Sequence, residues 1–511
     1  MDYAARRPAL QGTHQAAAPF FFIPADTRYA AGLTAASGAS AGFFTWYVAA
    51  SHSRVTASDL ALLAFVVFGA VAAVGLWLAY ARIVSAWAQL DYRALLQADA
   101  FAYVPLFALW FYVLQIPGGL ASASFLSFLV LLSYVAIKVG GLAYFIRPAR
   151  MITVVFLATR VPLIIISSFA AILLGQRAGQ HWSPAHGIMF DVWSRWDAQH
   201  YLDIATIGYH GKDIAFFPLY PFLIRNLGNL IGDHLIAGLI ISNLAFFAAL
   251  AYLYALTKKE FGDESTAFHA IFYTAIFPTA IFFSAIYTES LFLLLTVASV
   301  YYARRGNYIT SGVVGGLAAL TRPEGVLVAL PLAYEIWRGW REGQSTAAAR
   351  GLVGLALVPA GLLVYMGYLY VLVGDWLAFD KVQVHWNRHL APPWVSISNT
   401  LHLIAAHPLA SASSVNHLIE LVFTFAFLVL MVIGFRALRP SYSIYFAASL
   451  LVPMSTSSLM SMPRFELVIF PAFMLLALWG RRPVVNSAIV SLFLPLLGLF
   501  TVLFADWYWL A

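Results

Sequence analysis

Long apolar runs recur along this sequence, and they restrict its fold more than any other feature. Many of them reach the roughly 17–25 residues that a helix needs to cross the hydrocarbon core of a membrane. Only 10% of the residues are Asp, Glu, Lys or Arg, whereas 62% are hydrophobic. A soluble chain has about a quarter of its residues charged. The sequence therefore predicts an all-α polytopic membrane protein with about 13–15 transmembrane helices.

Hydropathy along the chain places the spans. The candidates are 30–50, 57–81, 100–117, 124–147, 151–174, 234–257, 266–283, 287–303, 308–320, 326–337, 350–373, 416–435, 441–458, 465–480 and 485–504. The pair 308–320 and 326–337 is too short for two full spans. We expect two broken helices that meet at 321–325, because one continuous helix would reverse the orientation of every later span.

Basic residues after every second span orient the chain, since cytoplasmic loops carry an excess of Lys and Arg. They include Lys258 and Lys259, Arg304 and Arg305, Arg338 and Arg341, Arg436 and Arg439, and Arg481 and Arg482. The non-cytoplasmic face then receives the loops 176–232, 284–289, 321–325, 375–415 and 455–464 and the segment DWYWLA. The net charge of +7 fits basic cytoplasmic loops and gives no reason to expect nucleic-acid binding.

Several signatures are absent from the sequence. Without cysteine there are no disulfides or thiolate ligands. The lack of an Asn-X-Ser/Thr sequon favours a bacterial plasma membrane over the endoplasmic reticulum. There is no P-loop, HExxH or Asp-X-Asp, and His200 and Asp203 lack a third ligand at metal-binding spacing. We therefore expect no cofactor; a divalent metal is compatible with the sequence but not implied by it.

The segment 194–225 collects charges among aromatic residues in an otherwise apolar chain. Residues at three-to-four spacing in the loop 176–232 predict amphipathic helices there. Asp197 follows Trp196, and His200 and Tyr201 lie three and four positions later on the same helix face. A carboxylate in such a setting is suited to accept a proton from a hydroxyl. Asp197 is the leading candidate for chemistry.

Two other interpretations of Asp197 stay open. It could cap a short interfacial helix or pair with Arg195. Asp191 and Asp203 lie six residues to either side and are the alternative carboxylates.

Ionisable residues interrupt the apolar run LTRPEGVLV. Such groups are costly at membrane depth and normally line a cavity or have a partner. Arg322 suits an anionic head group, because guanidinium binds phosphate in bidentate fashion. Alternatively, Arg322 and Glu324 form a mutual ion pair that joins the two broken helices.

Other polar residues have simpler explanations as well as functional ones. Arg160 needs a partner or a lipid phosphate, whereas Glu289 and Asn243 fit interhelical hydrogen bonds. Arg464 either binds phosphate or pairs with Glu466. The loop 375–394 mixes cations and amides with tryptophan, as a sugar-phosphate site would, although a solvated loop has a similar composition. Its candidates are Lys381, Gln383, His385, Trp386 and Arg388.

Taken together, these motifs resemble a known family. They are WDAQHYLDIATIGY, AFFPLYPFLIR, YTESLF, LTRPEG, the loop with Gln383, Trp386, Pro392, Pro393 and Trp394, and MPRFELVIFPAF. In this order, over about residues 150–480, they are similar to the PIG-V-type mannosyltransferases. The resemblance implies a GT-C fold and an inverting transfer of a sugar, usually mannose, from a polyprenyl-phosphate donor. It also implies a glycolipid or other membrane-proximal acceptor on the non-cytoplasmic face.

The resemblance also implies roles for particular residues. Enzymes of this kind place a carboxylate in the first long external loop, and the matching residue is Asp197 as general base. Its neighbourhood is Arg195, Trp196, His200, Tyr201 and Asp203. The residues expected around the donor phosphate and sugar are Arg322, Glu324, Lys381, Gln383, His385, Trp386, Arg388 and Arg464.

The expected organisation has three parts. Residues 1–150 form an extra transmembrane module of unassigned role, 151–415 form the catalytic core with its two long external loops, and 416–511 complete a groove for the donor lipid. Two different functions remain possible. A lipid or solute transporter would use the polar site near 321–325, and a non-catalytic scaffold subunit would use 1–150 for docking.

Overall fold

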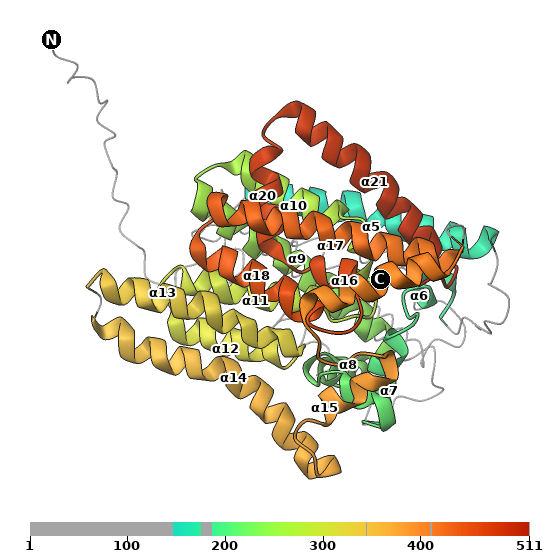
Figure 1. Ribbon diagram of the computed structural model, residues 1–511, viewed down its shortest axis with the longest axis horizontal. Coiled ribbons are helices and arrows are strands. Elements are labelled where there is room, and N and C mark those ends of the chain that lie inside the picture. The colour runs from blue at the N-terminus through green and yellow to red at the C-terminus, as the bar shows by residue number, and fades with distance from the viewer. Residues whose placement is uncertain (1–146, 175–185, 344, 409–410, 510–511) are drawn as a thin grey trace, which may run out of the picture. The chain divides into compact units, whose positions relative to one another are not determined.

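The computed structural model describes residues 147–174, 186–343, 345–408 and 411–509, which belong to one compact unit (Figure 1). The four spans predicted before residue 147 lie outside the described residues. So does nearly all of the predicted module 1–150.

Most of the described residues are helical. No strand occurs among them beyond an isolated bridge between Leu390 and Thr456. The helices up to the broken pair are α5 (Arg147–Leu173), α6 (Ile188–Asp191), α7 (Ala198–Thr206), η1 (Gly211–Ala215), α8 (Leu219–Ile231), α9 (His234–Phe261), α10 (Glu264–Ile276), η2 (Ala280–Phe283) and α11 (Glu289–Ala303). The remainder are α12 (Tyr308–Ala319), η3 (Pro323–Val328), α13 (Ala329–Arg341), α14 (Ser345–Val373), α15 (Ala378–Lys381), η4 (Val382–Trp386), α16 (Pro393–Ala406), α17 (Ala412–Ala437), α18 (Pro440–Met454), α19 (Met462–Glu466), α20 (Phe470–Trp479) and α21 (Pro483–Ala505). The predicted all-α class is confirmed.

Five of these helices are long and apolar enough to cross a membrane: α5, α9, α14, α17 and α21. Shorter apolar helices, among them α11, α12 and α20, fill the space between them. Many large apolar side chains on the long helices are exposed, such as Val371 on α14 and Val432 on α17. Apolar residues all round a helix of this length are stable in lipid and not in water. The chain is therefore an integral membrane protein.

The predicted span 266–283 is not one continuous helix. It is divided into α10 and η2 at Pro278: this proline has no N–H to donate and disfavours helical conformation in the residue before it, and Phe277 is accordingly extended with ψ of 141°. Arg160 of α5 then satisfies the carbonyls at the break. The Arg160 guanidinium donates to the carbonyls of Ala275 and Ala280, both at 2.7 Å, and its side chain is buried. These carbonyls lie at the interruption, where they have lost helical partners and need other donors. Arg160 thus has the partner that an intramembrane cation requires.

The predicted broken pair is confirmed. Helix α12 ends at Ala319 and α13 begins at Ala329, with the 3₁₀ segment η3 between them. A Cβ atom on Gly325 would overlap the backbone of Ala318, so only glycine permits this close approach. α12 also packs along α14 (Figure 1). The junction 321–325 is held in place as an irregular segment among helices.

A network of ion pairs joins helix ends whose loops are predicted to be cytoplasmic. Arg439, before α18, binds both carboxylate oxygens of Glu335 on α13, at 2.7 and 2.8 Å. Arg304, after α11, contacts Glu260 on α9 at 2.6 Å and Glu335 at 3.7 Å. Bidentate arginine–carboxylate pairs have defined geometry. This network joins α9, α11, α13 and the start of α18 at one end of the helices.

The amphipathic helices predicted in the loop 176–232 are present as α6, α7 and α8. On α7, Tyr201 and Ile204 are buried, whereas Asp203 and Thr206 are exposed. Two of its backbone hydrogen bonds tie this loop to other motifs. The Ile286 amide donates to the Trp193 carbonyl at 3.1 Å, and the Leu219 amide donates to the Leu320 carbonyl at 3.0 Å.

Candidate active site

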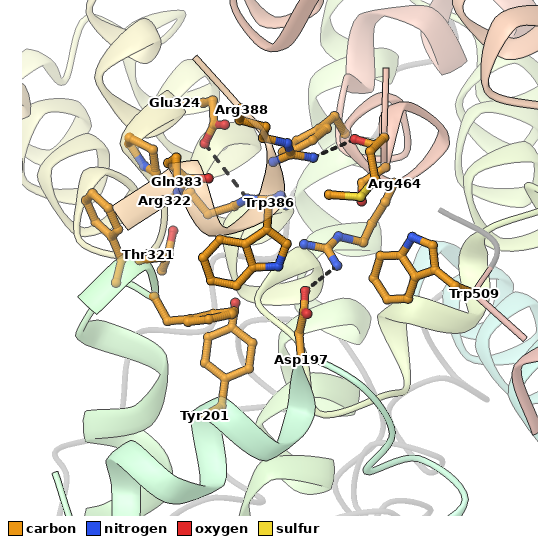
Figure 2. A pocket seen from close by; sticks show the side chains of 17 residues that line it. Asp197, Tyr201, Thr321, Arg322, Glu324, Gln383, Trp386, Arg388, Arg464 and Trp509 are labelled. Atoms are coloured by element: carbon orange, nitrogen blue, oxygen red, sulfur yellow. Dashed lines mark hydrogen bonds and ion pairs between the residues drawn. The ribbon is translucent and has the colours of Figure 1, made fainter. Parts of the chain in front are cut away.

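One cavity of about 120 Å³, open to the exterior, is built from segments that are far apart in the sequence (Figure 2). Its lining includes Asp197, Tyr201 and Phe216 from 194–217, Thr321, Arg322 and Glu324 from the broken helix junction, Gln383, Trp386 and Arg388 from the loop after α14, Met460, Arg464 and Phe465 around α19, and Trp509 after α21. Each of these segments falls on or next to a loop that the basic residues assign to the non-cytoplasmic face. Their convergence on one cavity agrees with the prediction that these segments share one face.

Asp197 immediately precedes the first residue of α7, where the chain turns sharply. Trp196, with φ of 56°, adopts the left-handed conformation, which is strained for a bulky residue. The Tyr287 hydroxyl donates to the Arg195 carbonyl at 3.0 Å and so holds the turn against the YTESLF motif. The Asp197 side chain does not cap α7. Its carboxylate is paired with Arg464 at 2.6 Å and stays partly exposed to the cavity.

Glu289 is the counterion at the centre of the site. Its side chain is fully buried at the first residue of α11, where the helix dipole favours a negative charge. One of its oxygens lies 2.9 Å from Arg464 Nε and 3.2 Å from Arg322 Nη1. Sequence reasoning assigned Glu289 only an interhelical hydrogen bond, because nothing in the sequence shows that two arginines reach it.

The remaining pairs follow from this arrangement. Arg322 and Glu324, whose mutual pairing was one prediction, are 3.9 Å apart, so Glu289 is the nearer partner of Arg322. Arg464 pairs with Asp197 and Glu289, whereas the Glu466 carboxylate oxygens have no hydrogen-bond partner among the described residues. Although burial lowers the pKa of Arg464, the carboxylates of Glu289 and Asp197 raise it overall above its usual value.

Arg388 is the cavity-lining arginine without a carboxylate within 4 Å among the described residues. It donates from Nη2 to the Met460 carbonyl and lies over the Phe465 ring, 5.3 Å from its centroid. Burial and the neighbouring positive charge of Arg464 lower the pKa of Arg388 to about 10. Its charge is therefore retained at neutral pH and is not neutralised by an ion pair.

Aromatic side chains surround these charges. Phe216 packs edge-on against Tyr201 and lies 6.0 Å from the Trp386 ring. Trp509 lies on the other side of the Asp197–Arg464 pair from Trp386 (Figure 2). The segment DWYWLA was grouped with the loops that line the cavity, but nothing local in the sequence marks Trp509 as part of a site.

Other candidate residues lie behind the cavity lining. His200 contacts Asp213 at 2.6 Å and stacks on Phe216, which does line the cavity. Arg195 is buried with its guanidinium over the Trp507 ring. Burial lowers the pKa of Arg195 to about 10, although Asp506 and Asp191 oppose this effect. These residues surround the turn that carries Asp197 and do not face the cavity.

Three candidates point elsewhere. Asp203 is exposed on α7, and Lys381 pairs with Asp375 at 2.6 Å on the surface. His385 is exposed and hydrogen-bonded to the Val382 carbonyl. Within the described part of the chain, no group of three or more His, Asp or Glu side chains is arranged to hold a metal ion.

Comparison with known sequences identifies the family to which this arrangement is similar. The family model described as Mannosyltransferase (PIG-V) matches residues 138–340. The predicted resemblance to PIG-V mannosyltransferases is confirmed. The matched range contains Asp197, Glu289, Arg322 and Glu324, whereas Arg388, Arg464 and Trp509 lie beyond it.

Individual relatives agree with this family. GPI mannosyltransferase 2 of Yarrowia lipolytica is 29% identical over 152 residues, which are 30% of this chain and 41% of that protein. GPI alpha-1,6-mannosyltransferase 2 of Cricetulus griseus is 32% identical over 145 residues, which are 26% of this chain and 29% of that protein. The similarity thus covers less than half of either relative. Among solved structures, the Archaeoglobus fulgidus oligosaccharyltransferase matches with a TM-score of 0.35 and 14% identity, over 67% of this chain and 53% of that one.

Proposed function

We propose that this protein is an inverting membrane mannosyltransferase. It transfers mannose from a polyprenyl-phosphate donor to a glycolipid or other membrane-proximal acceptor on the non-cytoplasmic face. The observation that carries the proposal is the pairing of Asp197 with Arg464 in a cavity that Arg322 and Arg388 also line. The similarity of residues 138–340 to the PIG-V family supports the reaction type.

In the proposed reaction Asp197 is the general base. An acceptor hydroxyl attacks the anomeric carbon of the donor from the face opposite the phosphate, and its proton passes to the Asp197 carboxylate. The bond between the anomeric carbon and the phosphate oxygen breaks, so the configuration inverts. Polyprenyl phosphate leaves with the bonding electron pair. Arg464, at 2.6 Å from Asp197, fixes the direction of the carboxylate.

Arg388 is the proposed partner of the donor phosphate. Arg322 and Arg464 already have Glu289 as counterion, whereas Arg388 has no carboxylate in contact among the described residues. A phosphate that develops charge in a site partly shielded from water is stabilised strongly by a fixed cation. Gln383 and Trp386, from the same loop, line the cavity beside Arg388 and provide an amide and an aromatic ring for the sugar.

The ion pairs favour an enzyme over a transporter. A transport site at the broken helices would be expected to bind its solute at 321–325. There, however, Arg322 is buried and paired with Glu289, which comes from the motif beside the Asp197 turn. The junction is thus part of the same charged assembly as the proposed base.

Mutation of the proposed base tests this function. Asp197→Asn removes the proton acceptor, and general bases contribute about 10²–10⁴-fold to such rates. We expect transfer from polyprenyl-phosphate-mannose to fall by at least about 100-fold with expression unchanged. The matched control is Asp203→Asn, which makes the same change on α7 at an exposed position. Equal activity of Asp197→Asn and Asp203→Asn would refute the role of Asp197.

A further inference from the structure

The segment Asp506–Trp509, here called the tryptophan strap, follows α21 and turns back over the proposed site. Trp507 adopts a left-handed conformation with φ of 61°, and the Trp507 and Tyr508 amides donate to carbonyls of the last turns of α21, at 3.2 and 2.9 Å. A bulky residue in this conformation costs free energy unless the surrounding contacts require it. The strap is therefore held in a specific position.

The contacts of the strap lie against the turn that carries Asp197. The Trp196 ring contacts Trp507 and Trp509 edge-on, with centroids 5.6 and 5.4 Å apart. The Arg195 guanidinium lies 4.6 Å from the Trp507 centroid. Edge-on aromatic contacts and cation–π contacts each stabilise such packing. Trp196 is thus fixed between two strap residues, immediately before the proposed base.

Only one strap residue reaches the cavity. Trp509 lines it together with Asp197, and the Arg464 guanidinium lies 5.7 Å from the Trp509 centroid. The indole N–H groups of Trp196, Trp507 and Trp509 are all buried without an acceptor among the described residues, so this feature does not distinguish Trp509. What distinguishes Trp509 is that it alone of the three lines the cavity.

We infer that Trp509 binds the pyranose ring at the reaction centre, as a sugar-recognition residue that the family match does not cover. The C–H face of a pyranose is apolar and packs on an aromatic ring. Trp386 lies across the Asp197–Arg464 pair and forms the opposite aromatic wall (Figure 2). This inference rests on the proposed transferase function, and the ring can belong to the donor or to the acceptor.

The first measurement compares two lipids that differ only in the sugar. Binding of polyprenyl-phosphate-mannose and of polyprenyl phosphate to the purified full-length protein is measured in detergent. Trp509→Ala should weaken binding of the mannosyl lipid about tenfold, and leave binding of the sugar-free lipid unchanged, if the donor ring packs on Trp509. If the ring belongs to the acceptor, both lipids bind as before. The apparent KM for a membrane lipid extract used as acceptor then rises by a similar factor.

Two control variants separate sugar recognition from packing. Trp507→Ala removes an equivalent contact with Trp196 but not a cavity wall, so it should keep the wild-type preference between the two lipids. Trp340→Ala, at an exposed position on α13, controls for expression and for the loss of a large side chain. No change in either measurement for Trp509→Ala, or an equal change for Trp507→Ala, overturns the inference. A wild-type protein that neither prefers the mannosyl lipid nor transfers mannose overturns the proposed function instead.

Discussion

Replacing Glu289 with glutamine should destabilise this protein, because it leaves two buried arginines short of a counterion. Glu289 is fully buried and is shared by Arg322 and Arg464. Glutamine keeps the shape of the side chain but removes the negative charge. The two guanidinium groups then remain buried with less compensation, and an unpaired buried charge is the costly outcome.

The structure indicates how large the effect is. Breaking a buried ion pair by removing one partner costs about 3–5 kcal/mol. Arg464 keeps Asp197 at 2.6 Å, so most of its compensation survives. Arg322 keeps only Glu324 at 3.9 Å, and most of the loss falls there. We therefore expect the lower end of the range, about 3 kcal/mol, which is a factor of more than about 100 in the unfolding equilibrium.

Unfolding in mixed micelles with increasing fraction of denaturing detergent, followed by tryptophan fluorescence, measures this difference. The matched control is Glu466→Gln. Glu466 is as buried as Glu289, but neither of its carboxylate oxygens has a hydrogen-bond partner among the described residues. It loses no ion pair on mutation, so the change should stay below about 1 kcal/mol.

Two results would refute the reasoning. The first is a Glu289→Gln protein within about 1 kcal/mol of wild type, which would mean that the two arginines do not depend on this carboxylate. The second is equal destabilisation by Glu289→Gln and Glu466→Gln, which would show that any buried glutamate matters to the same extent, whether paired or not.

Two further predictions concern the broken helices and the unpaired arginine. Gly325→Ala should lower the thermal unfolding temperature in detergent, because the added Cβ would overlap the Ala318 backbone. The control Gly498→Ala on α21 places its Cβ in open space and should leave the unfolding temperature unchanged. An unchanged temperature for Gly325→Ala would contradict the close approach of Gly325 to Ala318. Arg388 is charged below its pKa of about 10, whereas the donor phosphodiester is anionic at neutral and at alkaline pH. The affinity for polyprenyl-phosphate-mannose should therefore be constant near neutral pH and fall as the pH rises through about 10. Binding measured from neutral pH upward should show no such fall in Arg388→Ala, and identical profiles for the two proteins would exclude Arg388 as the phosphate partner.

Much of the fold could be predicted from the sequence because a bilayer imposes strong local rules. A helix must satisfy its own backbone within lipid, so length and hydropathy alone place α5, α9, α14, α17 and α21. The basic loops sort the connections between two faces. The break at 321–325 followed from the same rules, since an unbroken helix would have reversed the orientation of later spans.

The sequence was less informative about which distant side chain satisfies the backbone at a break. Pro278 marks the interruption of the span 266–283 in the sequence, but nothing there shows that Arg160, from another helix, donates to the carbonyls beside it. Hydropathy contains no information on such a contact, because it describes each segment separately.

The sequence by itself indicated that the chain spans a membrane and which charged and aromatic motifs interrupt its apolar runs, because hydropathy, motifs and charge patterns are local properties of the chain. Only the tertiary structure decided which charges neutralise one another. Glu289 rather than Glu466 became the counterion of Arg464, and Asp197 was paired with an arginine 267 residues away. The tertiary structure also placed Trp509 in the cavity wall. Ion pairs and cavity walls depend on distances in space between separate helices, and these are set by the packing of the whole assembly.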